Sequence, residues 1–237
     1  MSPLTGVLGE AWQLYKRYAA HFLVISFIIY VPTAIVVGVL YRYAGYAGSG
    51  IAWVIDLFAT FLLQTALVKA VQDVRDGRVD MDLGQTIKAA LPYLLPVAAA
   101  SILAAIGIVI GFILIIVPGL ILLTFWSLIV PSIVIGEAGV FESFSRSWRT
   151  VRGYAWHVFG TYILVFLIWI AFRIVLALIL LALPGLARYF LTDVIAGTLF
   201  TPFLALVVTL IYYRLTAAHA GQWAPAAAGA GWPGGPG

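Results

Sequence analysis

The sequence contains no cysteine among its 237 residues and only three histidines. The absence of cysteine excludes disulfides, thiolate zinc sites and cysteine nucleophiles. Only 9% of the residues are charged, whereas a soluble domain carries roughly 25%. Because 64% of the residues are hydrophobic, the charged residues could not cover a soluble surface. The composition therefore predicts a protein embedded in a bilayer and, since helices satisfy their own backbone, an all-α fold.

Residues that could carry catalysis or bind a metal are few and scattered. Asp73, Asp76, Asp80 and Asp82 lie close together, but arginines separate them and their spacing is unlike that of an EF-hand loop. We interpret this segment as a solvated turn centred on residues 76–77. We predict no catalytic residue, no metal site and no cofactor, and we do not expect an enzyme. The histidines are far apart: His21, His157 and His219.

Six apolar segments are long enough to cross a membrane, which takes about 20 mainly apolar residues. They cover residues 21–41, 51–71, 94–117, 119–136, 156–183 and 191–213. The third and fourth meet at Val117, Pro118 and Gly119, where proline and glycine predict a tight reversal. We predict one membrane domain, residues 1–215, followed by a disordered Gly/Ala/Pro tail, residues 216–237.

Basic residues outside these spans lie mainly on one side. Arg42 and Arg188 fall on the other side. The positive-inside rule then predicts that both termini are cytoplasmic. The richer side holds Lys16, Arg17, Lys69, Arg75, Arg78, Lys88, Arg146, Arg149, Arg152 and Arg214.

Three cytoplasmic segments, 7–22, 82–93 and 139–155, have the helical spacing of amphipathic helices. Helices with aromatic side chains on one face and basic ones on the other lie in the head-group plane. In the second segment, Asp82 followed by Gln85 predicts a capping box. We expect five basic side chains to contact anionic head groups: Lys16, Arg17, Arg146, Arg149 and Arg152.

The first and third of these segments are also similar in sequence. Residues 11–22 read AWQLYKRYAAHF and residues 147–158 read SWRTVRGYAWHV. Trp, Tyr, Ala and His coincide, which favours three repeats of an interfacial helix followed by a helical hairpin. The alternative is that any helix leading into a span looks like this.

Serines alternate along the third segment at Ser143, Ser145 and Ser147. None lies in a G-x-S-x-G elbow, and no His–acid pair lies nearby to activate them. We therefore predict that they are surface residues of a helix.

Two charges fall inside predicted spans, Asp56 and Arg173. Such charges are costly unless they are paired or functional. We predict an ion pair that locks the second span to the fifth, with Asp193 as a rival partner of Arg173. The alternative is a polar site inside a cavity, and prolines within three spans (Pro32, Pro131 and Pro202) would suit it.

Small residues form a stripe along the third span at Ala100, Ala104, Gly107 and Gly111. This spacing lets helix backbones approach closely. We predict packing within the chain, and a contact between two copies in a homo-oligomer is the alternative.

The stretch 118–160 has a Pro-Gly pair before an apolar span, Pro131 inside it and Glu137 at its end, with Ser147-Trp148 ahead of a basic turn. This pattern resembles the membrane domain of some bacterial glycerophosphoryl diester phosphodiesterases and related stand-alone inner-membrane proteins. The resemblance implies a bacterial plasma (inner) membrane and a lipid-related setting. It does not imply hydrolysis, because that activity lies in a separate soluble barrel of roughly 250 residues.

We expect a non-catalytic, lipid-interacting accessory or scaffold module in lipid or envelope metabolism. Its expected partners are anionic membrane lipids and a membrane or cytoplasmic protein. Nucleic acid is not expected, since the aromatic residues beside the arginines should face the bilayer. The alternative function is a small transporter or lipid translocator that uses Asp56 and Arg173.

Overall fold

The structure is a computed structural model that describes residues 3–43, 45–75 and 78–229. All regular secondary structure in these ranges is helical, which confirms the all-α prediction. The helices are α1 (Val7–Arg17), α2 (Ala19–Tyr43), α3 (Gly45–Val74), α4 (Leu83–Leu114), α5 (Ile116–Phe125), α6 (Ile129–Val134), α7 (Val140–Val151), α8 (Ala155–Ile179) and α9 (Gly185–Gly229).

Six stretches are long and apolar enough to cross a membrane, so the chain is a multi-span membrane protein. They agree with the predicted spans to within about a turn at most ends, although the third begins earlier and the sixth ends later. The stretches are Ala19–Leu40, Gly48–Val74, Leu83–Leu114, Ile116–Val134, Ala155–Ile179 and Val194–Ala220.

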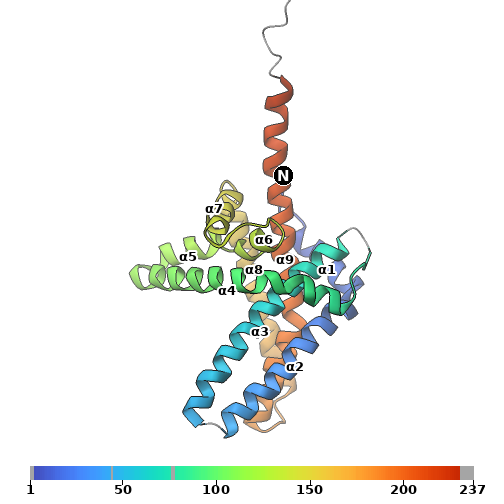
Figure 1. Ribbon diagram of the computed structural model, residues 1–237, viewed down its shortest axis with the longest axis vertical. Helices are drawn as coiled ribbons and strands as arrows, with labels where there is room; N and C mark the ends of the chain where they lie inside the picture. The colour runs from blue at the N-terminus through green and yellow to red at the C-terminus, as the bar shows by residue number, and fades with distance from the viewer. Residues whose placement is uncertain (1–2, 44, 76–77, 230–237) are drawn as a thin grey trace, which may run out of the picture.

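These helices do not form one parallel bundle. In Figure 1, α2, α3, α8 and α9 run broadly along the long axis, whereas the α4–α5 hairpin runs across them. Helices α1, α6 and α7 gather at the same end of the long helices. The hairpin carries a strongly apolar, exposed tip, since Ile113, Leu114 and Ile115 are each at least 65% exposed.

Helix α9 forms the centre of the core. Half of its span is buried inside the protein, compared with 6% of the α8 span. A single cluster joins α9 to α1, α2 and α3 through fully buried side chains, including Val7, Phe22, Leu67, Leu206 and Ile211. Within α8 only Val158 and Val165 are buried. Most of the surface of this helix therefore faces outward, where lipid would surround it.

The reversal between α4 and α5 lies at Ile115, and the predicted position at 117–119 is wrong. Ile115 has extended backbone angles, and Pro118 falls in the first turn of α5. Proline is tolerated there because a first-turn N–H has no helical partner to lose.

The predicted fourth span is broken. Helix α5 ends at Phe125 and α6 begins at Ile129, two residues before Pro131. Pro131 cannot donate a hydrogen bond to the carbonyl four residues before it, so it fits the first turn of a new helix better than a helix interior.

Asp82 forms the predicted capping box. Its Oδ1 accepts a hydrogen bond from Gln85 N at 2.8 Å, and Gln85 Oε1 accepts one from Asp82 N at 2.9 Å. The separate interfacial helix predicted for 82–93 is wrong, however, because α4 continues without a break through Pro92 and Pro96. Membrane helices tolerate proline in this way when neighbouring groups satisfy the freed carbonyls.

The apolar face of α1 packs inside the protein, whereas the sequence predicted that it would face the head-group layer. Val7 and Ala11 are at most 1% exposed within the cluster that α9 dominates. In α7 the buried face is Ser143, Ser147 and Val151, while Phe141 is 81% exposed. The apolar face of α1 thus covers the protein's own core, whereas α7 buries mainly small side chains and leaves Phe141 exposed.

Helix α9 continues to Gly229, beyond residue 216, where the sequence predicted the disordered tail to begin. The segment after Leu215 is rich in alanine, the strongest helix former, and Thr216 Oγ1 donates to Tyr212 O at 2.7 Å. Residues 230–237 of the predicted tail lie outside the described residues.

Candidate functional site

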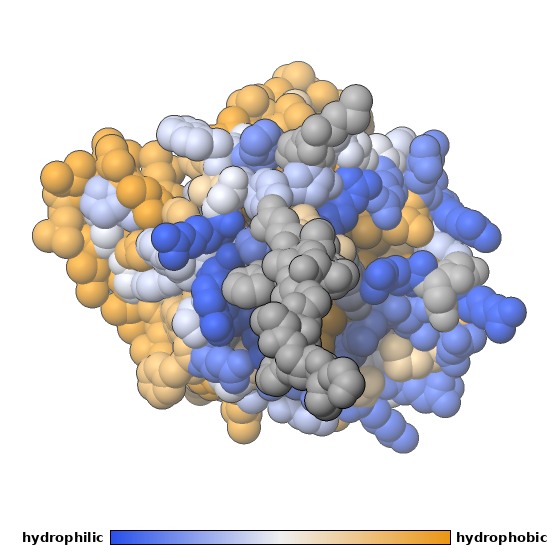
Figure 2. All heavy atoms as spheres, turned by 90° about the horizontal axis from the view of Figure 1, so that it is seen from above, coloured by the Kyte–Doolittle hydropathy of each residue, from blue (hydrophilic) through white to orange (hydrophobic). Residues whose placement is uncertain are grey.

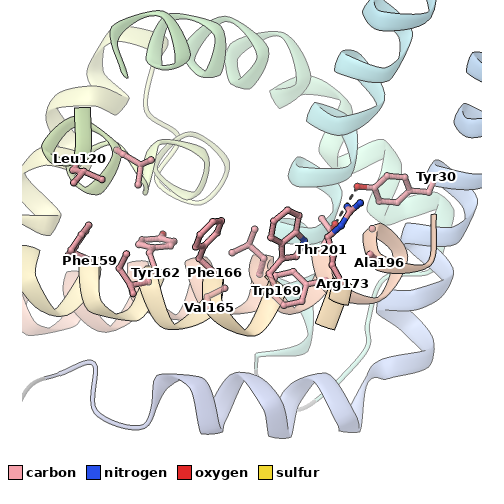
Figure 3. A pocket seen from close by; sticks show the side chains of 15 residues that line it. Tyr30, Leu120, Phe159, Tyr162, Val165, Phe166, Trp169, Arg173, Ala196 and Thr201 are labelled. Atoms are coloured by element: carbon pink, nitrogen blue, oxygen red, sulfur yellow. Dashed lines mark hydrogen bonds between the residues drawn. The ribbon is translucent and has the colours of Figure 1, made fainter. Parts of the chain in front are cut away.

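One face of α8 lines an open cleft of about 700 Å³ (Figure 3). Aromatic side chains follow one another along it at helical spacing: Phe159, Tyr162, Phe166 and Trp169. Helices α2, α5 and α9 supply the opposite walls. We call this the α8 cleft.

The α8 cleft opens sideways, toward the surface that a bilayer would cover. Ile163 and Phe166 on its rim are 42% and 53% exposed. Its depth is closed by Val165 and Ala196, which are at most 3% exposed. The side chains that line this groove are almost all apolar. An apolar chain from the membrane could therefore fill it without leaving polar groups of the protein unsatisfied.

Polar groups lie at one end of the α8 cleft. Among the α8 residues that line the cleft, Arg173 comes last along the chain. Its guanidinium lies 5.3 Å from the Trp169 ring centroid, a cation–π distance. The Tyr30 hydroxyl and Thr201 Oγ1 lie 3.4 Å apart beside it. The cleft is therefore apolar along its length and cationic at one end.

A second cleft of about 520 Å³ lies on the side of α8 that faces α1. Trp12, Tyr15 and Phe203 line it, and Phe200 lines both clefts. Tyr15 Oη donates to Leu199 O at 2.9 Å, and burial raises the pKa of this phenol, so it remains a donor. Helix α8 thus has a cleft on each side.

Asp56 lies in a different hollow, between α2 and α3, with room for only about 10 Å³. Tyr30 lines both this hollow and the α8 cleft, so it stands between Asp56 and Arg173. The side chain of Asp193, the rival partner, lies outside the described part of the chain. The ion pair between Asp56 and Arg173 stays a prediction.

We expect Asp56→Asn and Arg173→Gln each to lower the yield of folded protein at least about twofold, because either change leaves a charge inside a span without its opposite. The double variant Asp56→Arg/Arg173→Asp should recover part of this loss. Gel filtration in detergent measures the yield. Single variants that match the native yield would rule out the pair as a structural lock.

The chain matches a family model over residues 53–222. This covers most of its length. The protein belongs to the DUF7847 family, defined by a domain of unknown function. Neither a search of curated proteins nor a search of solved structures finds a match. The DUF7847 match contains α5, α8 and α9 of the cleft, while α1 and Tyr30 lie before it.

Figure 2 shows hydrophilic residues at the end of the molecule where α1, α6 and α7 gather in Figure 1. Lys16 and Arg17 from α1, Arg149 from α7 and Arg152, directly after α7, are exposed there. Lys16 Nζ also lies 5.7 Å from the Trp12 ring centroid. We call this surface the basic end.

Arg146, the fifth predicted head-group contact, is held within the DUF7847 domain. Its guanidinium donates to Gly136 O and pairs with Glu142 at 2.8 Å. Gly136 was not singled out from the sequence, although it has no room for a side chain beside Arg146 and Tyr212. Arg146 therefore supports the loop before α7, and the contact of the five basic side chains with head groups stays a prediction.

Arg214 is a further residue that sequence reasoning missed. It pairs with Glu10 of α1 and donates to Pro3 O at 3.1 Å and Thr5 O at 2.8 Å. These contacts fasten the start of the chain to α9. Arg214 was counted only as a basic residue, because its partners are over 200 positions away in the sequence.

The small-residue stripe of α4 faces α5 and α6 of the same chain. Ala100 and Ala104 pack in a buried cluster with Ile133. A Cβ on Gly111 would lie 3.0 Å from Gly119 Cα, so the two helix backbones approach closely there. The stripe is thereby covered within one copy of the DUF7847 domain.

Proposed function

We propose that this DUF7847 protein is a non-catalytic, lipid-interacting membrane module that holds a lipid acyl chain in the α8 cleft. The observation that carries this proposal is the row of aromatic side chains that lines a sideways-opening groove. Its volume of about 700 Å³ falls within the range of roughly 300–1,000 Å³ found for ligand pockets. The protein would act as an accessory or scaffold for a partner in lipid or envelope metabolism.

The length of the α8 cleft supports an acyl chain. From Phe159 to Arg173, α8 rises about 21 Å at about 1.5 Å per residue. One leaflet of the hydrocarbon core is about 15 Å thick. The cleft is therefore long enough for a chain that enters from one leaflet.

The basic end supports a second contact with lipid, at the head groups. A basic side chain near an anionic membrane surface contributes about 1 kcal/mol of attraction. The exposed Lys16, Arg17, Arg149 and Arg152 would act together there. The proposal puts the basic end and both termini on the cytoplasmic side of a bacterial membrane, in line with the positive-inside rule.

The repeat supports a common origin for the helices that form the basic end. Tyr18 ends α1 immediately before α2, and Tyr154 precedes α8 in the same way. The matched tyrosines thus occupy equivalent bends between an amphipathic helix and a span. This is consistent with duplication, and with the resemblance to the phosphodiesterase membrane domains.

A transporter or lipid translocator remains the alternative function. It requires a path that joins Asp56 to Arg173. The hollow at Asp56 holds about 10 Å³, which is at the lower limit for a single water. The geometry therefore favours a site that holds lipid over one that passes a solute.

Filling the α8 cleft should remove the bound lipid. We expect Ile163→Trp to reduce the number of co-purified lipids, counted by native mass spectrometry, by about one per protein, because the indole would occupy space that an acyl chain needs. Leu164→Trp is the matched control, since Leu164 is 48% exposed and does not line the cleft. An equal lipid count in both variants and in the native protein would contradict the proposal.

A further inference from the structure

A fourth hollow meets the α8 cleft at Arg173. It has a volume of about 430 Å³ and lies between the last turns of α8 and the first turns of α9. Arg188 and Thr192 line it from α9 and, being four residues apart, lie on one face of that helix. Arg173 lines both this hollow and the α8 cleft, and Figure 3 shows it at the end of the cleft. We call it the arginine hollow.

The charges of the arginine hollow suit an anion. Two guanidinium groups from different helices reach it, and each presents a planar set of donors that matches phosphate oxygens. Gly185, the first residue of α9, also lines the hollow. The N–H groups of the first helical turn favour anions further.

A buried hydroxyl gives an independent indication of a ligand. Thr192 is 6% exposed, and its Oγ1 has no hydrogen-bond partner among the described atoms. Buried polar groups are nearly always hydrogen-bonded. A phosphate oxygen in the arginine hollow would accept a hydrogen bond from this hydroxyl.

The location of the arginine hollow identifies which lipid could reach it. Arg173 lies six residues before the end of α8, about 9 Å along the helix axis. The hollow is thus near the end of α8 that is remote from the basic end, at the level of the other leaflet's head groups. A lipid with its head group there could extend its chain along the aromatic row toward the basic end.

We propose that the arginine hollow binds the phosphate of an anionic phospholipid whose acyl chain lies in the α8 cleft. This inference rests on the proposed function, and it adds the class of lipid and the leaflet that supplies it. Arg173, Arg188 and Thr192 hold the head group, while Trp169 and Phe166 contact the chain.

Photo-crosslinking tests the two proposals separately. A photoreactive phenylalanine replaces Phe166, and in a control it replaces Leu167, which is 55% exposed and does not line the cleft. Both proteins are placed in vesicles of equal phosphatidylglycerol and phosphatidylcholine. We expect the phosphatidylglycerol-to-phosphatidylcholine ratio of the crosslinked lipid to be roughly fivefold higher at position 166 than at 167.

Arg188→Gln should bring that ratio close to the control value, because the phosphate would lose one of its two guanidinium partners. Thr192→Val keeps the side-chain volume and should lower the ratio as well, so the test remains decisive if Arg188→Gln does not fold. A high yield at 166 with an unselective ratio would overturn the head-group assignment alone. A yield at 166 no higher than at 167 would overturn the proposed function too.

Soluble inorganic phosphate could also bind in the arginine hollow. A separate measurement therefore distinguishes free phosphate from the phosphate of a lipid head group. The protein is placed in vesicles of phosphatidylcholine only, and its unfolding temperature is measured with and without inorganic phosphate. We expect that inorganic phosphate does not raise the unfolding temperature of the native protein relative to Arg188→Gln. A rise in the unfolding temperature with phosphate that is absent in Arg188→Gln, together with an unselective crosslink ratio, would assign the hollow to a soluble anion. That result would overturn the proposal that a phospholipid binds there.

Discussion

Ser147→Ala is expected to destabilise the protein strongly. Ser147 is fully buried, and its Oγ donates to Phe125 O at 2.6 Å and accepts from Leu128 N at 3.1 Å. These two backbone groups belong to the break between α5 and α6, where the regular helical hydrogen bonds stop. Each buried group left unsatisfied costs about 1–3 kcal/mol, so we expect a loss of about 2–4 kcal/mol.

The measurement is thermal unfolding in detergent, where this loss corresponds to a decrease of roughly 5–15 °C. Ser145→Ala is the matched control, because Ser145 is exposed and its hydroxyl donates only within its own helix, to Glu142 O. That variant should stay within about 0.5 kcal/mol of the native protein. Equal decreases in both variants would show that Ser147 does not support the break.

Gly136→Ala is expected to have an effect at least as large. A Cβ at this position would lie 2.5 Å from Tyr212 Oη and 2.6 Å from Ser132 O, with the Arg146 guanidinium also in contact. Because Ser132 O is backbone, the clash cannot be relieved by rotating a side chain. Overpacking usually costs about 1–3 kcal/mol, and we expect about 3 kcal/mol or more here.

The yield of monodisperse protein and its unfolding temperature measure this effect. Gly139→Ala is the control, since a Cβ on Gly139 meets nothing within 4 Å. We expect it to change stability by about 1 kcal/mol or less, because Gly139 only caps α7. If Gly136→Ala behaves like Gly139→Ala, the loop before α7 has more room than its geometry indicates.

The spans and the start of α4 could be predicted because their signals are local. Length and apolar composition decide whether a helix can cross a membrane. Asp82 and Gln85 are three positions apart, so the capping box is visible in the sequence alone.

The break at residues 126–128 could not be predicted, because the group that stabilises it comes from a different helix. Ser147 lies 19 and 22 positions from the backbone groups it bonds. Ser143 and Ser147 were wrongly expected on the surface, whereas Ser145 is exposed as predicted. Only two of the three, Ser143 and Ser147, are buried, and the alternation of serines does not distinguish them from Ser145.

The α8 cleft left a signal in the sequence, but an ambiguous one. Phe159, Phe166 and Trp169 recur at helical spacing on the face that also carries Arg173. A membrane helix that simply faces lipid shows aromatic residues in the same way. What distinguishes a groove is the wall supplied by α5 and α9, and helix packing of that kind is a long-range property.

The clamp between Arg214 and the start of the chain also bears on how the protein is made. Glu10, Pro3 and Thr5 are synthesised before their partner on α9, which comes more than 200 residues later. At about 5–20 residues per second, α1 is complete roughly 10–40 s before Arg214 exists. Until Arg214 is made, α1 therefore lacks this contact with α9, and we expect its apolar face to lie against the membrane surface during that interval.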